Sequence, residues 1–191
     1  MENKLPLGQI NAGAMQGGIV LGIFGMLSLV VFRWSLVIPF CSTLFGIMFI
    51  ATPIVATYLT LRFRNVNYGL KAAFPFMNGF LYTLFTGFYA SVWIALLVYV
   101  YLQYFDHGQI FMDYTQSIDT PEMQQYLRAS GMDAELSRIS GMHGVKGLVA
   151  VMQSMGAATY AAMSIYFALI FGPIISAVIG LFTRRTERFN S

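Results

Sequence analysis

Four long runs without a charged residue constrain this chain more than any other feature. They cover residues 5–32, 34–61, 72–105 and 147–183, with 28, 28, 34 and 37 residues, and together hold 127 of the 191. Each run exceeds the roughly 20 apolar residues that span a bilayer. Only 10% of all residues are charged, against about 25% in soluble domains. The pattern predicts an integral membrane protein and excludes a soluble enzyme, a disordered chain and a nucleic-acid binder.

The runs predict an all-α membrane protein with one domain over residues 1–191. We expect a four-transmembrane-helix bundle, with a short helical extracytoplasmic segment, 105–148, between the third and fourth helices. The predicted spans are residues 14–31, 36–61, 74–104 and 149–183. Only four residues separate the first two spans, so these two must form a tight antiparallel hairpin.

Basic residues predict the orientation, because cytoplasmic segments of membrane proteins carry an excess of Lys and Arg. With the N-terminus inside, seven basic residues lie on the cytoplasmic side: Lys4, Arg62, Arg64, Lys71, Arg184, Arg185 and Arg188. The opposite side carries four basic residues and also six acidic ones. We therefore expect a multi-pass protein of the bacterial inner (cytoplasmic) membrane with both termini in the cytoplasm.

The segment between the last two spans contains helix signals. The sequence Asp119-Thr120-Pro121-Glu122 is a typical helix start, with a capping side chain followed by proline at the first helical position. Gly131 would end that helix, and a second one would follow over residues 133–139 and stop near Gly141. We expect a small helical hairpin on the outer membrane surface, and a solvated connector without a role is the alternative.

Small residues recur at four-residue spacing in the predicted spans. Helices in lipid associate by close backbone approach, which small residues permit. The predicted packing positions are Gly18, Gly22, Gly79, Gly87, Ala158 and Gly172. These stripes mark contacts inside one bundle or between copies of the chain, and the spacing alone does not distinguish the two.

No Asp, Glu, Lys, Arg or His lies within the predicted spans, although proton relays, ion pathways and intramembrane hydrolases normally place such residues there. The amides of Asn78 and Gln153 are predicted intramembrane polar contacts, first as hydrogen bonds between helices and second as substrate contacts. Pro53 and Pro173 lie inside spans and should kink them. An open cytoplasmic half is the functional interpretation, and tolerated prolines are the structural one.

The two histidines lie at opposite ends of the outer segment. His107, His143 and Asp106 could meet there as a weak candidate metal site, but their spacing fits no known ligand motif. The single cysteine, Cys41, cannot form an internal disulfide. We expect no catalytic constellation and no cofactor.

The order of motifs resembles a known family. A basic segment, R-x-R-N-x-N-x-G-L-K-x-A-F (62–74), precedes the aromatic third span, and M-Q-Q-Y-L…S-G-M-D-A-E-L (123–136) precedes a Gly- and Ala-rich fourth span. This order resembles the four-span bacterial family catalogued as domain of unknown function 4199, which is common in Bacteroidetes. The matching positions are residues 69–74 and 131–135, and the outer segment departs by being richer in aromatic residues. The resemblance implies the fold and the membrane location, and it transfers no functional residues.

These observations favour a non-enzymatic interaction or accessory component of the cell envelope. Its partners would be the lipid bilayer and a membrane or periplasmic protein, or further copies of the chain. The alternative is a small oligomeric transporter or channel for a neutral or weakly polar solute, with Asn78 and Gln153 lining its path. A membrane enzyme that uses Asp106, His107 and His143 is the third hypothesis.

Overall fold

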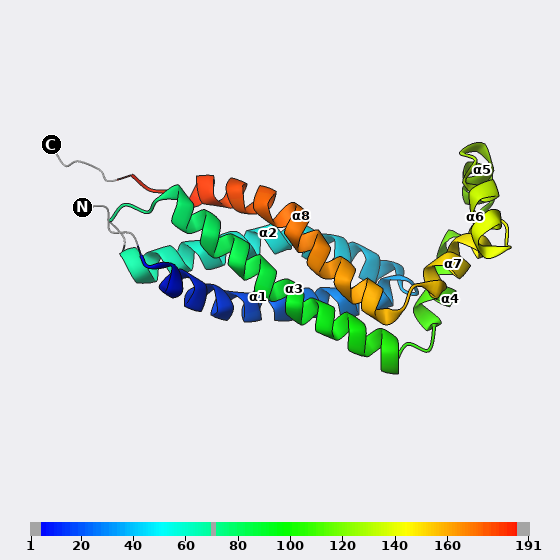
Figure 1. Cartoon of the computed structure of the whole chain (residues 1–191), viewed down its shortest axis with the longest axis horizontal. Coiled ribbons are helices and arrows are strands. Elements are labelled where there is room, and N and C mark those ends of the chain that lie inside the picture. Colours follow the sequence, from blue (N-terminus) through cyan, green and yellow to red (C-terminus); the bar gives the residue numbers. More distant parts are fainter. Residues whose placement is uncertain (1–4, 70–71, 187–191) are drawn as a thin grey trace.

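Four long helices dominate the computed structural model, which describes residues 5–69 and 72–186 (Figure 1). The described residues form eight helices, of which four are long and apolar enough to cross a membrane. These four are α1 (Leu7–Ser35), α2 (Pro39–Tyr68), α3 (Phe76–Tyr104) and α8 (Ala157–Thr183). The prediction of an all-α protein with four spanning helices is confirmed, and the chain is a multi-pass membrane protein.

The third helix is the centre of the four-helix bundle. α3 packs most extensively against α8 and α1, whereas α2 packs mainly against α1. Successive helices run in opposite directions, so the start of α1 and the end of α8 lie at one end, here called the terminal end (Figure 1). The opposite end, here called the module end, holds the turn between α1 and α2 and the end of α3.

Close approach between α1 and α3 depends on two predicted glycines. A Cβ atom built at Gly18 would overlap the Tyr89 Cβ and approach the Thr86 carbonyl oxygen to 3.2 Å. A Cβ at Gly22 would lie 3.0 Å from the Cβ of Trp93. These positions therefore permit α1 to lie directly against the backbone of α3.

The other predicted packing positions differ in their surroundings. A Cβ at Gly79 would come within 3.3 Å of the Gly180 Cα in α8, and one at Gly172 would make ordinary contact with α3. Gly87 and Ala158 make no such contact inside the bundle. No atom lies within 4 Å of a Cβ built at Gly87, and Ala158 is exposed. Both residues sit on helix surfaces that no other helix covers.

Polar and aromatic contacts fix the helices against one another inside the bundle. The Thr60 and Thr83 hydroxyls lie 2.9 Å apart between α2 and α3, and both residues are buried. The Tyr89 hydroxyl donates to the Asn11 side chain at 2.8 Å and so joins α3 to α1. Such interhelical hydrogen bonds replace contacts that lipid cannot supply.

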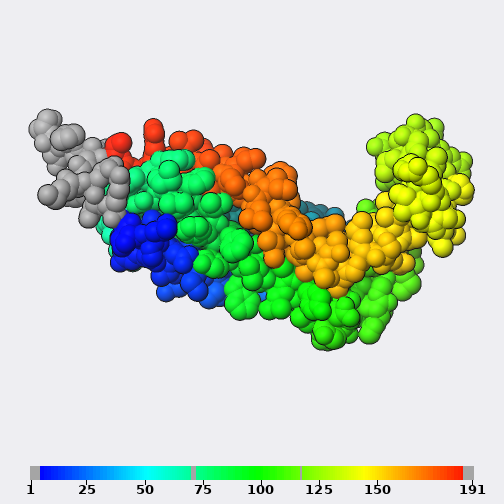
Figure 2. Space-filling view, viewed as in Figure 1, coloured from blue at the N-terminus to red at the C-terminus, as the bar shows by residue number. Residues whose placement is uncertain are grey.

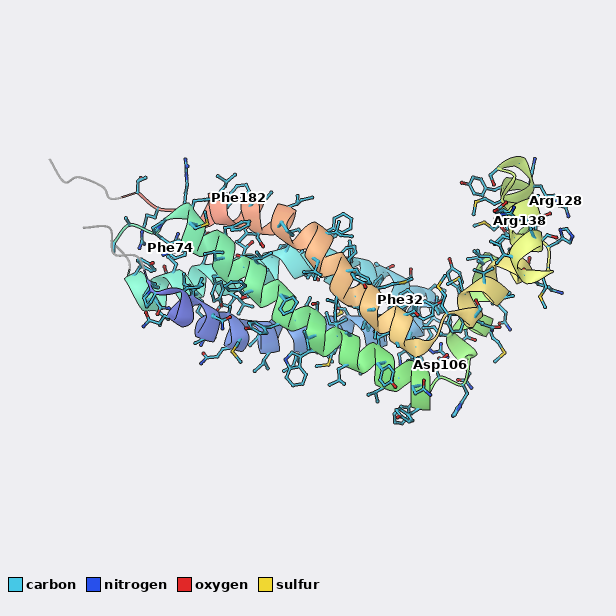
Figure 3. All side chains as sticks on the ribbon, in the orientation of Figure 1. Phe32, Phe74, Asp106, Arg128, Arg138 and Phe182 are labelled. Carbon is cyan, nitrogen blue, oxygen red and sulfur yellow. The ribbon has the colours of Figure 1, made fainter. Side chains whose placement is uncertain are left out.

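Backbone and arginine contacts close the terminal end. Phe74 and Arg185 form an antiparallel bridge with backbone hydrogen bonds of 2.8 and 3.0 Å. The Arg185 guanidinium also donates to the Ala72 carbonyl oxygen at 2.7 Å, and Arg64 donates to that of Thr183 at 2.9 Å. Figure 3 places Phe74 at this end. The connection before α3 is thereby held against the end of α8.

Three predicted boundaries differ from the helices. The first helix begins at Leu7, not at residue 14. Arg62 and Arg64 lie in the last turns of α2, because the helix continues through the segment predicted as a loop. The fourth spanning helix begins at Ala157, not at residue 149, because Met155 and Gly156 have extended backbones that interrupt it. The hydropathy of the chain is continuous across this break, so charge and composition do not reveal it.

A separate group of four short helices, here called the module, lies between α3 and α8. It consists of α4 (Gln109–Ile118), α5 (Pro121–Ala129), α6 (Met132–Ser140) and α7 (Gly144–Ser154). Figure 1 shows that the module turns away to one side of the bundle, and in Figure 2 its helices α5 and α6 form a distinct lobe. Two of these helices, α5 and α6, match the predicted hairpin, whereas α4 and α7 were not predicted.

The module has its own hydrophobic core. The core side chains come from α5, α6 and α7 and are at most 8% exposed: Leu127, Leu136, Val145 and Val149. The predicted helix signals act as expected, since the Thr120 hydroxyl accepts from the Met123 amide at 3.2 Å. Gly131 and Gly141 adopt φ values of 74° and 72°, a conformation that favours glycine.

Candidate functional site

A polar cluster joins the bundle to the module at the module end. Arg33 lies in the last turn of α1, Tyr101 in the last turn of α3 and Asp113 in α4. The Arg33 Nε donates to the Tyr101 hydroxyl at 3.0 Å, and its Nη1 forms an ion pair with Asp113 at 2.6 Å. The Arg33 and Asp113 side chains are 22% and 25% exposed. The three residues therefore form a half-buried, charge-paired cluster at the boundary between spanning helices and module.

Asp106 lies beside this cluster just before α4, and its backbone amide donates to the Tyr101 carbonyl oxygen at 2.9 Å. The residue is 1% exposed, and its two carboxylate oxygens accept from the Ile110 amide at 3.0 and 3.3 Å. A carboxylate that accepts from the first turn of a helix stabilises the start of that helix. Figure 3 places Asp106 where the chain leaves α3 and enters the module. We therefore assign Asp106 a structural role at the start of α4.

A partly open cavity of about 770 Å³ lies beside the polar cluster. Its walls are mostly apolar and come from both regions of the molecule: Leu29 and Val30 of α1, Val98 and Leu102 of α3, Phe111 of α4 and Ser164 of α8. Arg33, Tyr101 and Trp34 also line it. A mostly apolar cavity with a few convergent polar groups is the usual form of a ligand site.

The base of the cavity is fixed by contacts across the break between α7 and α8. The Tyr160 hydroxyl of α8 donates to the Met152 carbonyl oxygen of α7 at 2.7 Å. The ring of Tyr160 also packs against Phe111 of α4, with centroids 5.6 Å apart. These contacts hold two module helices against the start of the last spanning helix.

The predicted metal residues do not come together. The Asp106 carboxylate accepts from the backbone at the start of α4. His143 lies beside Asp133, and the His143 Nδ1 is 3.3 Å from the Asp133 Oδ2. His107 has a positive φ of 46° in the turn before α4. Within residues 5–69 and 72–186, no three His, Cys, Asp or Glu side chains are grouped so that they could hold a metal ion.

Asp133 is the polar link between α6 and α7. Its carboxylate accepts a hydrogen bond from the Gly144 amide at the start of α7. This bond, with smaller contributions from His143 and Arg128, lowers the pKa of Asp133 below its usual value. Folding of the module therefore favours the charged form of the Asp133 side chain.

The two predicted intramembrane amides have different fates. Asn78 is buried and donates to the Tyr68 hydroxyl, which joins the start of α3 to the end of α2. The prediction for Gln153 is wrong, since this residue is exposed and lies in α7, before the fourth spanning helix begins. Neither amide lines the cavity beside Arg33 or the smaller cavity beside Pro53.

The two interior prolines lie within α2 and α8, and each helix continues through its proline. Pro53 lines a second cavity, of about 300 Å³, between these two helices. Its other walls are aliphatic or aromatic side chains such as Ile54, Ile174 and Phe182. Because this cavity carries almost no polar groups, it resembles a lipid-filled groove more than a path for a solute.

Comparison with known sequences then identifies the family. The chain matches the family described as Protein of unknown function (DUF4199) over residues 16–185. The chain belongs to this family. The match covers all four spanning helices and the module of the DUF4199 protein apart from the first turns of α1. No curated protein and no solved structure matches the sequence.

Sequence reasoning did not identify the cluster of Arg33, Tyr101 and Asp113. Arg33 lies in the predicted turn between the first two spans, and Asp113 is one of the six acidic residues of the predicted outer segment. The available signal was Arg33 itself, the single charged residue between Lys4 and Arg62. A lone basic residue at a span end needs a partner or a headgroup, but its partner lies 80 residues away on a helix that was not predicted.

Proposed function

We propose that this DUF4199 protein is a non-catalytic envelope component whose bundle anchors the module at the outer face of the inner membrane, where the module docks a partner protein. The observation that carries the proposal is a folded module with its own core and with large apolar side chains exposed outside the spanning helices. In this arrangement the terminal end faces the cytoplasm, in accord with Arg62, Arg64 and Arg184 at that end.

Exposed apolar residues on the module support a docking role. Met132 and Ile139 are 42% and 63% exposed. They are seven residues apart on α6 and therefore share one helix face. Tyr126 on α5 is 61% exposed and Met142, just after α6, is 52% exposed. Exposed apolar residues on the bundle are covered by lipid, but those on a water-facing module favour contact with another protein.

The transporter hypothesis has less support. Its proposed path depended on Asn78 and Gln153, yet Asn78 is bonded to Tyr68 within the bundle and Gln153 is exposed on α7. The enzyme hypothesis required Asp106, His107 and His143 to act together, and Asp106 is bonded within its own turn. The docking proposal uses residues that have no other role in the fold.

Site-specific photocrosslinking in native membranes tests the proposal. A photoreactive phenylalanine analogue replaces Ile139 in one variant and Ala134, on another face of α6, in the matched control. We expect one product of defined mass from position 139 and none from position 134. The mass of the product shows whether the partner is a different protein or a second copy of the chain.

A charged substitution complements the crosslink. We expect Ile139→Asp to abolish the product captured from a second position, Tyr126, without changing the melting temperature of the bundle, because Ile139 is exposed in the isolated chain. Equal crosslinking from positions 134 and 139, or no product from position 139, would contradict the docking proposal.

A further inference from the structure

The cavity at the module end has the properties of a site for one amphiphilic molecule. Its volume of about 770 Å³ falls within the range of roughly 300–1,000 Å³ that ligand sites occupy. Apolar side chains of α1, α3 and α4 form most of its wall, and Arg33 with Tyr101 supplies a polar edge. A ligand that fits this wall has an apolar chain and one polar end.

The level of the cavity in the bilayer indicates where that molecule comes from. Trp34, which lines the cavity, is 56% exposed at the end of α1. Tryptophan at the end of a spanning helix is typical of the headgroup level of a bilayer. The cavity also lies between spanning helices and the module, so it meets the bilayer at the boundary of its hydrocarbon. A lipid of the adjacent leaflet is therefore the molecule that reaches it.

The ion pair of Arg33 with Asp113 specifies the headgroup. Arg33 lines the cavity, and Asp113 lies beside it, with the carboxylate 2.6 Å from the guanidinium. The Arg33 guanidinium has five N–H donors, and its bonds to Tyr101 and Asp113 use two of them. The remaining donors suit a phosphate oxygen, and the Asp113 carboxylate accepts from an ammonium group. A purely anionic headgroup would meet the carboxylate of Asp113 with no compensating positive group of its own. The pair is complementary to a headgroup that carries both charges.

We infer that the cavity binds one zwitterionic phospholipid, with an acyl chain against Leu29, Val98, Leu102 and Phe111 and the headgroup at Arg33 and Asp113. The site is independent of protein docking at α6. It goes beyond the proposed function because bound lipid would contact α4 and the last spanning helix together. Occupancy would thereby stabilise the position of the module relative to the bundle.

Native mass spectrometry of the full chain tests the inference. The protein is delipidated in detergent and offered phosphatidylethanolamine or phosphatidylglycerol with identical chains. We expect one retained phosphatidylethanolamine, bound in preference to phosphatidylglycerol. Ser164→Phe fills the cavity wall, and we expect it to weaken retention by about tenfold or more. Ala158→Phe, an exposed position on the same helix, is the matched control and should retain the lipid.

A charge substitution provides a sharper test. Asp113→Asn leaves Arg33 without its carboxylate partner, so we expect the preference to shift toward the anionic phosphatidylglycerol. Equal retention of both lipids by the unaltered protein, unchanged retention in Ser164→Phe, or an unchanged preference in Asp113→Asn would overturn the inference.

Tryptophan fluorescence gives a second test, and its reporter variant, Trp93→Phe, leaves the cavity wall unaltered. The chain has two tryptophans, and Trp93→Phe leaves Trp34 as the only reporter. In phosphatidylglycerol vesicles with a minor fraction of chain-brominated phosphatidylethanolamine, we expect Trp34 to be quenched more than that fraction predicts. Trp34→Phe leaves Trp93 as the control, which should be quenched in proportion to the fraction. Equal quenching of the two tryptophans would contradict a lipid site at Trp34.

Discussion

The bundle and the module both consist of packed helices, but the helices of the bundle pack in lipid and those of the module pack in water. The spanning helices are apolar on all sides and approach one another at glycines such as Gly18 and Gly79. The module helices are short and amphipathic, and they bury leucine and valine side chains in a small core. Lipid provides no hydrophobic drive between helices, whereas water does. The comparison indicates that backbone proximity holds the bundle and that side-chain burial holds the module.

The largest expected effect concerns the core of the module. Leu127 is 2% exposed between α5 and α7. We expect Leu127→Ala to destabilise the module by about 2–5 kcal/mol, because the substitution removes buried apolar surface and leaves a cavity. Hydrogen exchange measured by mass spectrometry should show faster exchange in residues 109–154 and unchanged exchange in α1 and α3.

Ile139→Ala is the matched control for that experiment, since Ile139 is 63% exposed on the neighbouring helix. Its effect on exchange should be small. If Leu127→Ala instead accelerates exchange equally in α1 and α3, the bundle and the module unfold as one unit, and the distinction between them fails.

The second prediction concerns the contact between α1 and α3 at Gly18. In Gly18→Ala the new methyl group must displace α3, since it would overlap Tyr89 and crowd the Thr86 carbonyl oxygen. Gly87→Ala adds the same methyl group to a spanning helix where no atom lies within 4 Å. We expect Gly18→Ala to be less stable than Gly87→Ala by about 1–3 kcal/mol, the usual cost of overpacking. Thermal unfolding in mild detergent measures the difference, and equal stability would contradict packing through Gly18.

Two glycines of α3, Gly79 and Gly87, show how far the sequence could predict the fold. Runs without charge located four spanning helices, because lipid excludes ionisable groups. The spacing of small residues in α3 predicts a helix contact at both Gly79 and Gly87, although α8 covers only Gly79. A periodic pattern defines a face of one helix, and it carries no information on whether another helix lies there.

The sequence did not predict the break at Met155 and Gly156, and it did not predict the cluster at Arg33. The reasons are related. Apolar residues continue on both sides of the break, so hydropathy joined α7 to α8 and placed Gln153 in the membrane. Arg33 of α1 and Asp113 of α4 form an ion pair although 80 residues separate them in the sequence. Contacts between distant residues depend on the arrangement of helices, which local patterns do not specify.

The third prediction concerns a polar contact inside the bundle. The Thr60 hydroxyl bonds to the Ala56 carbonyl oxygen in its own helix and also lies 2.9 Å from the Thr83 hydroxyl on α3. The Thr57 hydroxyl bonds only to its own helix, at Pro53. We expect Thr60→Val to cost about 0.6 kcal/mol more than Thr57→Val, the average for a hydrogen bond between spanning helices. Unfolding of both variants in detergent gives the difference, and an equal cost would mean that the Thr83 contact contributes nothing.

The smallest expected effect is a pH dependence confined to the module. The hydrogen bond from the Gly144 amide lowers the pKa of Asp133, so folding favours its charged form. A lowered pKa in the folded state means that this stabilisation is complete above the ordinary pKa of an aspartate. It is lost as the pH falls through the lowered value. Acid should therefore loosen the contact of α6 with α7, whereas the bundle, which lacks this link, should respond less.

Comparison of hydrogen exchange in the unaltered protein and in Asp133→Asn at each pH checks this prediction, because the intrinsic pH dependence of exchange cancels in their ratio. We expect the two proteins to differ at neutral pH in residues 132–154 and to converge in acid. Glu135→Gln is the matched control, since Glu135 pairs with Arg138 within α6 and makes no described contact with α7. A ratio that stays constant with pH would show that the charge of Asp133 does not hold α7. The module would then be held by its apolar core alone, whereas the bundle is held by the close approach of helix backbones.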